Sequence, residues 1–401
     1  MDNGAYTIKV GMASDENTAL ISNCKMKVKS ERQRQFIGDQ IEDCKDCSGL
    51  YYILTHQKGF IINWDVEREV WEYIIKKKFA SLDPTLSTLI ITEPYFDFRP
   101  IQNNIDEIMF EEYGFDSILR TNPGYLSTFS QELSNPKDNN QPLGCLVVDS
   151  GFSFTHVTPY IASDTTRFRK IKSGIRRIDI GGKALTNHLK ELLSYRQINV
   201  MDETYVINQC KEDACFVSNN LDAAMKECKR NKNSFLREYV LPDFTTVKRG
   251  FVRNPENPEP ISSEQQILRL VNERFQVPEL LFNPSDVGIE QVGIVEAIVD
   301  SINSIPEKLR PHLFENILLT GGNALFEGFK ERVFSGIRSY CPAEFKVNVT
   351  LASNPITNSW EGGRVLANQY PDLLKSMIIT KKDYDESGDN KRQMCVDKFD
   401  V

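Results

Sequence analysis

Two short turns combine an acidic residue with a glycine, the residue types that could bind a phosphate and its metal ion. They are Asp2-Asn3-Gly4 and Asp149-Ser150-Gly151. Glycine can adopt a positive φ, so a tight turn can direct successive backbone N–H groups at an anion, with a carboxylate beside them for a hydrated cation. The two stretches align at a constant offset, so that Lys9 corresponds to His156. The pattern therefore predicts a phosphate-binding site at these turns.

The residues around each turn predict β-hairpins. The apolar run 145–148 is typical of a strand buried on both faces, and Phe152, Phe154 and His156 alternate with polar residues after the turn. Two such hairpins predict a duplicated unit whose hairpins face each other across a cleft, and two unrelated hairpins are the alternative. Only Met1 precedes Asp2, so we expect either a shortened first strand or a start further upstream, and an Asp2 that is poorly held.

Hydrophobic periodicity predicts the elements that must position these turns. We expect a β-meander over 2–28, strands at 51–55, 89–92 and 316–320, and helices from 64, over 101–112, over 183–194, and around 263–274 and 290–304. The last of these strands ends at Gly321-Gly322, where the backbone can approach a ligand closely. The composition of 133–142 is that of a linker and predicts a domain boundary.

Composition excludes several classes of protein. The chain has 401 residues, enough for two domains with their own cores, and its net charge of −8 argues against a surface that binds nucleic acid throughout. No apolar run reaches the length of a membrane span, so we expect a soluble intracellular protein. Nine cysteines form no disulfide framework, and Cys44 and Cys47 lack a second pair for zinc, with His56 as the nearest candidate ligand. The basic stretch 167–177 predicts either a solvated edge strand, which we favour, or a contact for DNA or an import factor.

The ordered motifs resemble those of actin and the actin-related proteins over nearly the whole chain. The two acidic turns match the family's phosphate hairpins, and Ile317-Leu-Leu-Thr-Gly-Gly322 matches its adenosine motif. Four further motifs occur in the family's order: Asn63-Trp64-Asp65, Ile91-Thr-Glu-Pro94, Gly181-Gly182 with Leu185-Thr186, and Tyr384-Asp-Glu-Ser-Gly388.

The resemblance implies an α/β fold, the actin-like fold shared with Hsp70 chaperones and sugar kinases, in which two duplicated ribonuclease-H-like domains surround a nucleotide cleft. The first domain would take 1–142 and 358–401, with 29–50 as a short loop-rich subdomain. The second would take 143–357, with 195–275 as an inserted subdomain.

The resemblance also assigns roles to the candidate site residues. Asp2 and Asp149 would hold a hydrated Mg²⁺ or Ca²⁺ that accompanies ATP, and Lys9 would reach the phosphates. The turn residues Asn3, Gly4, Ser150 and Gly151 would line the phosphates, Lys211 and Glu212 would border the adenine and ribose, and Gly321 and Gly322 would lie under the nucleotide.

Departures from the family pattern argue against catalysis. Tyr6 and Phe152 place bulky side chains in the phosphate turns, where they narrow the approach to the backbone. His156 matches the family's histidine that positions the attacking water. The helix expected to supply the partner glutamine corresponds to residues 119–124, and Pro123 lies near the glutamine position. In the family, a lysine and an aromatic side chain with a hydroxyl lie beside the adenine base. Ile356 and Phe326 stand at those positions in this chain. We therefore expect His156 to be a packing residue with satisfied contacts, and the protein not to be an enzyme.

Three motifs point within the family to a nuclear class of actin-related proteins: Asn354–Gly363, Tyr239–Phe244 and Gly288-Ile-Glu-Gln291. The resemblance implies a scaffold subunit of a Swr/SRCAP-type chromatin remodeller that exchanges a variant histone, found in the nucleus and secondarily in the cytoplasm. Its partners would be the motor subunit and a zinc-finger HIT-type subunit, with nucleosomes contacted indirectly and no membrane. An ATPase and a cytoskeletal polymer subunit are the alternatives, and the short 29–50 loop argues against self-polymerisation.

The partner surface is expected in 229–265, which is charged, rich in proline and therefore extended. It carries Phe235, Tyr239, Phe244 and Phe251, too many aromatic residues for a solvated loop. Some should pack on their own domain, and any exposed ones would be interface anchors.

Overall fold

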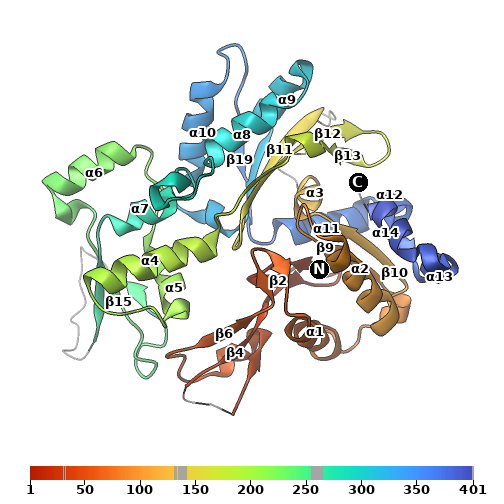
Figure 1. The fold of residues 1–401 in the computed structure, drawn as a ribbon, viewed down its shortest axis with the longest axis horizontal. Helices are drawn as coiled ribbons and strands as arrows, with labels where there is room; N and C mark the ends of the chain where they lie inside the picture. Colours follow the sequence, from red (N-terminus) through yellow and green to blue (C-terminus); the bar gives the residue numbers. More distant parts are fainter. Residues whose placement is uncertain (30, 32, 131–132, 134–141, 254–264, 400–401) are drawn as a thin grey trace.

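The computed structural model describes residues 1–29, 31, 33–130, 133, 142–253 and 265–399. The described chain forms two α/β lobes (Figure 1). Most of the predicted 133–142 linker and the segment 254–264 lie outside the described residues.

The first lobe is built around two three-stranded sheets that Met1 joins. One has the order β1-β2-β3 and the other β20-β10-β9. The Met1 amine donates to Ile90 O at 2.6 Å, and Thr92 N donates to Met1 O at 3.1 Å. Met1 therefore extends β1 along β9, and the first strand is short but held in place. The strands are β1 Asp2–Asn3, β2 Thr7–Val10, β3 Ala19–Ser22, β9 Thr88–Thr92, β10 Ser117–Thr121 and β20 Ile379–Thr380.

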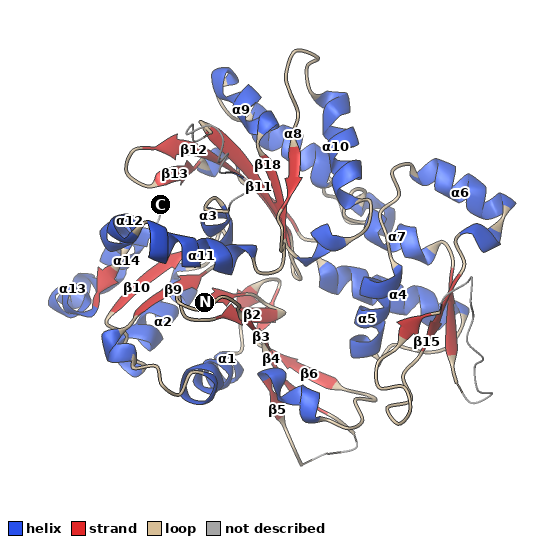
Figure 2. Ribbon diagram, turned by 180° about the vertical axis from the view of Figure 1, so that it is seen from behind, coloured by secondary structure: helices blue, strands red, loops and turns tan. Residues whose placement is uncertain are grey.

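The helices of the first lobe come from both ends of the chain. Asn63 caps the first of them, because its side chain accepts a hydrogen bond from Val66 N. The C-terminal helices lie beside α2 and β10 in both ribbon views (Figures 1 and 2). The helices are α1 Trp64–Glu72, α2 Arg99–Glu107, α3 Pro123–Ser127, α11 Asn358–Gln369, α12 Pro371–Met377, α13 Lys381–Glu386 and α14 Lys391–Phe399, and π-helical turns extend α1 to Lys78 and α2 to Glu112.

The second lobe contains one six-stranded sheet. Its order is β13-β12-β11-β18-β19, and β14 also pairs with β12. Strands β11, β18 and β19 run parallel, and the buried strands are apolar on both faces, as predicted. The strands are β11 Gly144–Ser150, β12 Thr155–Ser163, β13 Arg167–Lys170, β14 Arg176–Ile178, β18 Ile317–Thr320 and β19 Val349–Leu351.

The helices of the second lobe lie partly against this sheet and partly away from it, toward the strand at 237–240 (Figure 2). They are α4 Gly182–Arg196, α5 Thr204–Ala214, α6 Leu221–Arg230, α7 Glu273–Glu279, α8 Ile294–Asn303, α9 Arg310–Glu315 and α10 Phe329–Tyr340. The prediction of an edge strand in the basic stretch is confirmed, because β13 ends the sheet. Lys170, the last residue of β13, donates to Asn122 Oδ1 at 2.9 Å. Arg176 donates to backbone carbonyls, so both of these cations have intramolecular partners.

Two small subdomains flank the mouth of the cleft. The first contains β4 Cys24–Lys27, β5 Phe36–Ile37 and β6 Tyr51–Leu54, and the hairpin β7 His56–Gln57 with β8 Phe60–Ile61 follows it. The second contains β15 Arg237–Val240, β16 Phe251–Val252 and β17 Ile267–Leu270. The predicted helix around 263–274 is wrong: Ile267–Leu270 pairs with β15 along its whole length, and sheet pairing buries Leu268 and Leu270. The predicted helix at 119–124 is also wrong up to Thr121, because those residues belong to β10.

Candidate functional site

The two acidic turns occupy equivalent positions in their hairpins. Asp2 lies opposite Lys9 in the β1–β2 pair, and Asp149 lies opposite His156 in the β11–β12 pair. Gly151 N donates to Phe154 O at 3.0 Å, which closes the second turn. The predicted correspondence of Lys9 with His156 is therefore confirmed in the strand register.

The turns face a cavity of about 430 Å³ between the two lobes. Ten of the twelve residues predicted for the nucleotide site line it: Asp2, Asn3, Gly4, Lys9, Asp149, Gly151, Lys211, Glu212, Gly321 and Gly322. Ser150 and His156 do not. Ser150 is buried and its hydroxyl contacts Thr155 Oγ1 at 2.8 Å and Asn323 Nδ2 at 3.1 Å.

The two carboxylates proposed for the cation have different surroundings. Asp2 accepts a hydrogen bond from Thr92 Oγ1 at 2.7 Å and forms an ion pair with Lys9 Nζ at 3.2 Å. The expectation that Asp2 is poorly held is therefore wrong. Asp149 is half-buried, and its desolvation, with the nearby Asp2 charge, raises its pKa to about 6, while Lys9 acts in the opposite direction. Lys9 thus already supplies the positive charge beside this pair of carboxylates.

The Asn3 side chain is hydrogen-bonded within the first lobe. Its Nδ2 donates to Glu67 Oε1 at 2.7 Å and its Oδ1 accepts from Trp71 Nε1 at 3.1 Å. Asn3 therefore joins its turn to α1.

The nucleoside end of the cavity keeps the features that the resemblance implies. Gly321 has φ +88°, and a Cβ there would lie 2.3 Å from Ser150 O, so this turn requires glycine. A Cβ on Gly322 would meet no atom within 4 Å, so the backbone at Gly322 borders open space in the cavity. Lys211 Nζ donates to Gly182 O, Thr186 Oγ1 and Asn208 Oδ1 at 2.9–3.2 Å, and burial lowers its pKa. A nucleoside fits this end, although Lys211 is already bound within the protein.

Two aromatic rings lie beside the acidic turns and line the cavity. Tyr6 and Phe152, one from each turn, stack with ring centroids 4.9 Å apart and an interplanar angle of 24°. The rings are shared walls of the main cavity and of a second cavity of about 310 Å³ at the mouth of the cleft. The stacked rings therefore lie between the cavity at the acidic turns and the cavity at the mouth of the cleft.

His156 is a packing residue, but its contacts are not fully satisfied. Its ring lies 4.2 Å from that of Phe154 and 4.9 Å from that of Tyr95, measured between centroids. Its Nε2 is buried without a hydrogen-bond partner among the described residues, which corrects the expectation of satisfied contacts. Burial, reinforced by the Arg177 charge, lowers its pKa to about 3, so the imidazole is neutral at physiological pH.

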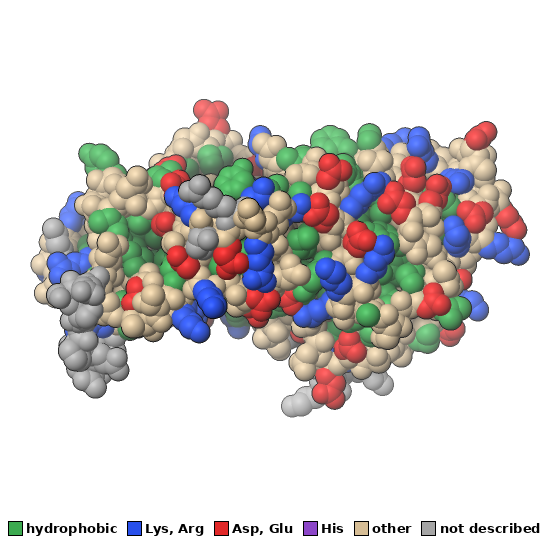
Figure 3. Space-filling view, turned by 90° about the horizontal axis from the view of Figure 1, so that it is seen from below, with side chains coloured by type: hydrophobic (Ala, Val, Ile, Leu, Met, Phe, Trp, Pro, Cys, Tyr) green, Lys and Arg blue, Asp and Glu red, His purple; other side chains and the backbone are tan. Residues whose placement is uncertain are grey.

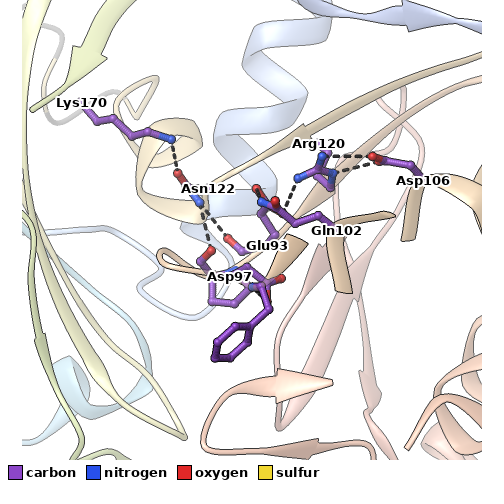
Figure 4. Close-up of polar contacts among 9 residues, drawn as sticks. Glu93, Asp97, Gln102, Asp106, Arg120, Asn122 and Lys170 are labelled. Atoms are coloured by element: carbon purple, nitrogen blue, oxygen red, sulfur yellow. Dashed lines mark hydrogen bonds and ion pairs between the residues drawn. The ribbon is translucent and has the colours of Figure 1, made fainter. Parts of the chain in front are cut away.

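A proline lies near the position expected for a water-positioning glutamine. Pro123 begins α3 and lines the cavity. The preceding Asn122 donates through Nδ2 to Glu93 O at 3.1 Å and Pro94 O at 3.3 Å, and accepts from Lys170 (Figure 4). This region therefore joins the two lobes instead of presenting a side-chain amide to a water molecule.

Sequence reasoning missed a buried charge network behind the cavity (Figure 4). Arg120 is 1% exposed and bonds Glu93 Oε2 at 2.6 Å and both Asp106 oxygens at 2.9 and 3.0 Å. Gln102 Nε2 donates to both Glu93 oxygens at 3.0 Å. The available signal was an arginine inside the buried strand 117–121, which requires carboxylate partners.

The cysteine pair shows no metal site. Cys44 Sγ donates to Asp46 O at 3.2 Å, and His56 instead contacts Thr55 Oγ1 at 2.7 Å through Nδ1. Within the described ranges, no group of three or more His, Cys, Asp or Glu side chains is placed to hold a metal ion.

Four aromatic residues were proposed as partner anchors, and the structure separates them. Tyr239 is fully buried, and the Phe235 ring packs against Phe216 and Phe275. Phe244 packs partly against the first small subdomain, whereas Phe251 is 42% exposed on β16. The prediction that some pack on their own domain is confirmed. Asn254–Pro260, the proline-rich end of this segment, lies outside the described residues.

Comparison with known proteins adds sequence evidence to this geometry. The family model described as Actin matches residues 1–399. The chain is 44% identical to Actin-related protein 6 of Drosophila melanogaster over 391 residues, 97% of this chain and 96% of that protein. It is 38% identical to Actin-related protein 6 of Oryza sativa subsp. indica over 421 aligned residues (97% and 96%), and 37% identical to Actin-like protein ARP6 of Yarrowia lipolytica over 400 (100% and 96%). In the part of the chain that the structure covers, no helix has the length and apolar character to cross a membrane.

Proposed function

Because the chain belongs to the actin family, we propose that it is a nuclear scaffold subunit of a Swr/SRCAP-type chromatin remodeller that exchanges a variant histone into nucleosomes. In this role the actin fold presents surfaces to partner subunits, with a cytoplasmic pool as a second location. The observation that carries the proposal is similarity to proteins named Actin-related protein 6 over nearly the whole chain. Affinity purification of the tagged full chain tests it: a motor ATPase and a zinc-finger HIT-type subunit should co-purify, and recovery of neither overturns it.

A non-catalytic role is supported by the geometry of the cleft. The actin-family fold generally binds a nucleotide with a divalent cation. Here the Tyr6–Phe152 stack places two bulky rings beside the phosphate turns, and Pro123 stands near the position expected for the glutamine. Phosphoryl transfer depends mainly on alignment, so loss of a positioning group removes much of what the protein can contribute.

A hydrolysis assay separates this role from that of an active ATPase. We expect weak or undetectable binding of Mg-ATP and hydrolysis no faster than the uncatalysed rate in single-turnover measurements. Rapid hydrolysis that is abolished by His156→Ala would contradict the non-catalytic assignment.

The partner surface is proposed around the exposed edge strand β16. Phe251 projects from this strand, which pairs with β15 on one side at Tyr239 and Val240. An exposed aromatic residue on a sheet edge suits an interface anchor. On the face shown in Figure 3, acidic and basic side chains are mixed. Because nucleic acid binds to clustered positive charge, this face does not suit a nucleic-acid partner.

Two matched substitutions test this surface. Phe251 and Phe334 are both 42% exposed. Phe334 lies on α10, on a different part of the second lobe from β16. Phe251→Ser should reduce co-purification of the partner subunits several-fold, and Phe334→Ser should leave it unchanged. Equal recovery with both variants would move the interface elsewhere, first to the basic strand β13.

A further inference from the structure

We propose that the Tyr6–Phe152 stack is a latch that holds the cleft closed without a nucleotide. Such a latch would act in the cleft whether or not the chain belongs to a remodeller. Its two components are the ring contact between the lobes and the hydrogen bond to the Tyr6 hydroxyl. Neither Tyr6 nor Phe152 has a positive φ, so the turns accommodate these side chains without backbone strain of that kind.

The first component of the latch is the stack itself. Tyr6 belongs to the first lobe and Phe152 to the second, and their rings meet at 4.9 Å. Stacked aromatic pairs contribute stability beyond the area that they bury. The contact therefore links the two acidic turns directly across the cleft.

The second component anchors the Tyr6 hydroxyl to the second lobe. Asn208 Nδ2 donates to this hydroxyl at 3.3 Å and to Glu212 Oε1 at 2.8 Å. The Asn208 Oδ1 atom accepts from Lys211 Nζ and from Thr186 Oγ1, each at 2.9 Å. The ring that closes the cleft is therefore fixed by α4 and α5.

Further contacts between the lobes lie on either side of the stack. At the mouth, Gly49 N donates to the Glu203 carboxylate at 3.3 Å. Behind it, Arg177 Nη2 donates to Lys58 O at 2.9 Å, and a Cβ on Gly59 would lie only 1.7 Å from the Phe154 ring. These contacts bind the lobes through protein groups alone, which makes closure independent of a phosphate and its cation.

The latch predicts that removing both rings restores dependence on nucleotide. Tyr6→Ala, Phe152→Ala and the double variant are compared with Tyr51→Ala, since Tyr51 lines the same mouth without joining the stack. Thermal unfolding is measured with and without 1 mM Mg-ATP, and the radius of gyration is measured by small-angle X-ray scattering. We expect no ligand-induced shift for the native chain or Tyr51→Ala. The double variant should have a larger radius without ligand, and Mg-ATP should raise its midpoint by several degrees.

Three results would overturn the latch. The first is a Mg-ATP shift in the native chain as large as that in the double variant. The second is an unchanged radius in a folded double variant, and the third is fully additive losses of stability from the two single substitutions. If the double variant does not fold, Phe152→Leu retains an apolar side chain without the stack. It should still expand the cleft, and an unchanged radius there also overturns the latch.

Discussion

At the scale of single residues, the buried titratable groups determine how stability responds to pH. Burial lowers the pKa of both His56 and His156 to about 3. In the unfolded chain a histidine titrates near pH 6.5. Between these values the unfolded chain binds more protons than the folded chain, so stability falls as the pH is lowered below about 6.5.

His156→Phe should remove one part of this acid sensitivity. Phenylalanine can pack between Tyr95 and Phe154 without a buried unpartnered Nε2. We expect stability at pH 8 equal to or above that of the native chain, and a gain of roughly 2 kcal/mol relative to it at pH 5. Urea unfolding at the two pH values measures this. A constant difference between the two proteins at both pH values would show that His156 does not titrate as assigned.

Glu67 has the opposite dependence. Burial raises its pKa to about 7, against hydrogen bonds that lower it, and its Oε2 has no hydrogen-bond partner among the described residues. Here the folded chain binds more protons between about pH 4.3 and 7, so its contribution to stability is lost as the pH rises through that range.

Glu67→Gln should therefore stabilise the fold at high pH. The amide oxygen can still accept from Asn3 Nδ2, which now donates to Glu67 Oε1. We expect the variant to exceed the native chain by roughly 3 kcal/mol at pH 8 and to match it near pH 4.5. Chemical denaturation across this range is the measurement, and a variant less stable at pH 8 would contradict the assignment.

At the scale of elements, the Arg120 network joins four segments of the first lobe. Arg120 on β10 bonds Glu93 after β9 and Asp106 on α2, and its guanidinium lies 5.0 Å from the Phe399 ring centroid on α14. Burial lowers the pKa of Arg120, but the Asp106 and Glu93 charges outweigh this and raise it overall. The network thus fixes the C-terminal helix against the sheet.

Arg120→Met should destabilise this lobe strongly. It leaves two buried carboxylates without their cation, a change that typically costs about 3–5 kcal/mol. Arg120→Met combined with Asp106→Asn and Glu93→Gln removes the unpaired charges and should recover part of the loss. Differential scanning calorimetry gives both values. Equal stability of the single and triple variants would show that the charges are not what makes the loss large.

At the scale of the whole molecule, the small subdomain around β4–β6 packs against the second lobe. Its core includes Phe36 and Leu50, and Tyr205 and Phe244 from the second lobe pack partly against it. The 29–50 stretch is thus partly committed to contacts within the chain, which leaves less of it to contact another subunit.

We expect the purified chain to stay in the supernatant when it is sedimented in magnesium and potassium salts that polymerise actin. Analytical ultracentrifugation should give a concentration-independent monomer mass. A pelleted fraction that increases with salt and protein concentration would favour the cytoskeletal alternative.

Local chemistry in the sequence determined the hairpins, the acidic turns and the turn at Gly321-Gly322. Each depends on neighbours within a few residues: apolar runs, a turn glycine, and the positive φ that Gly321 requires. Contacts distant in sequence could not be predicted in this way. The stack of Tyr6 on Phe152 joins residues of two lobes, and Arg120 takes its partners from separate elements. Pairing with β15 makes Ile267–Leu270 a strand, although its periodicity had suggested a helix. The fold buries Tyr239 and leaves Phe251 exposed. Only the tertiary structure decided these features, because pairing and burial depend on segments that the chain brings together when it folds.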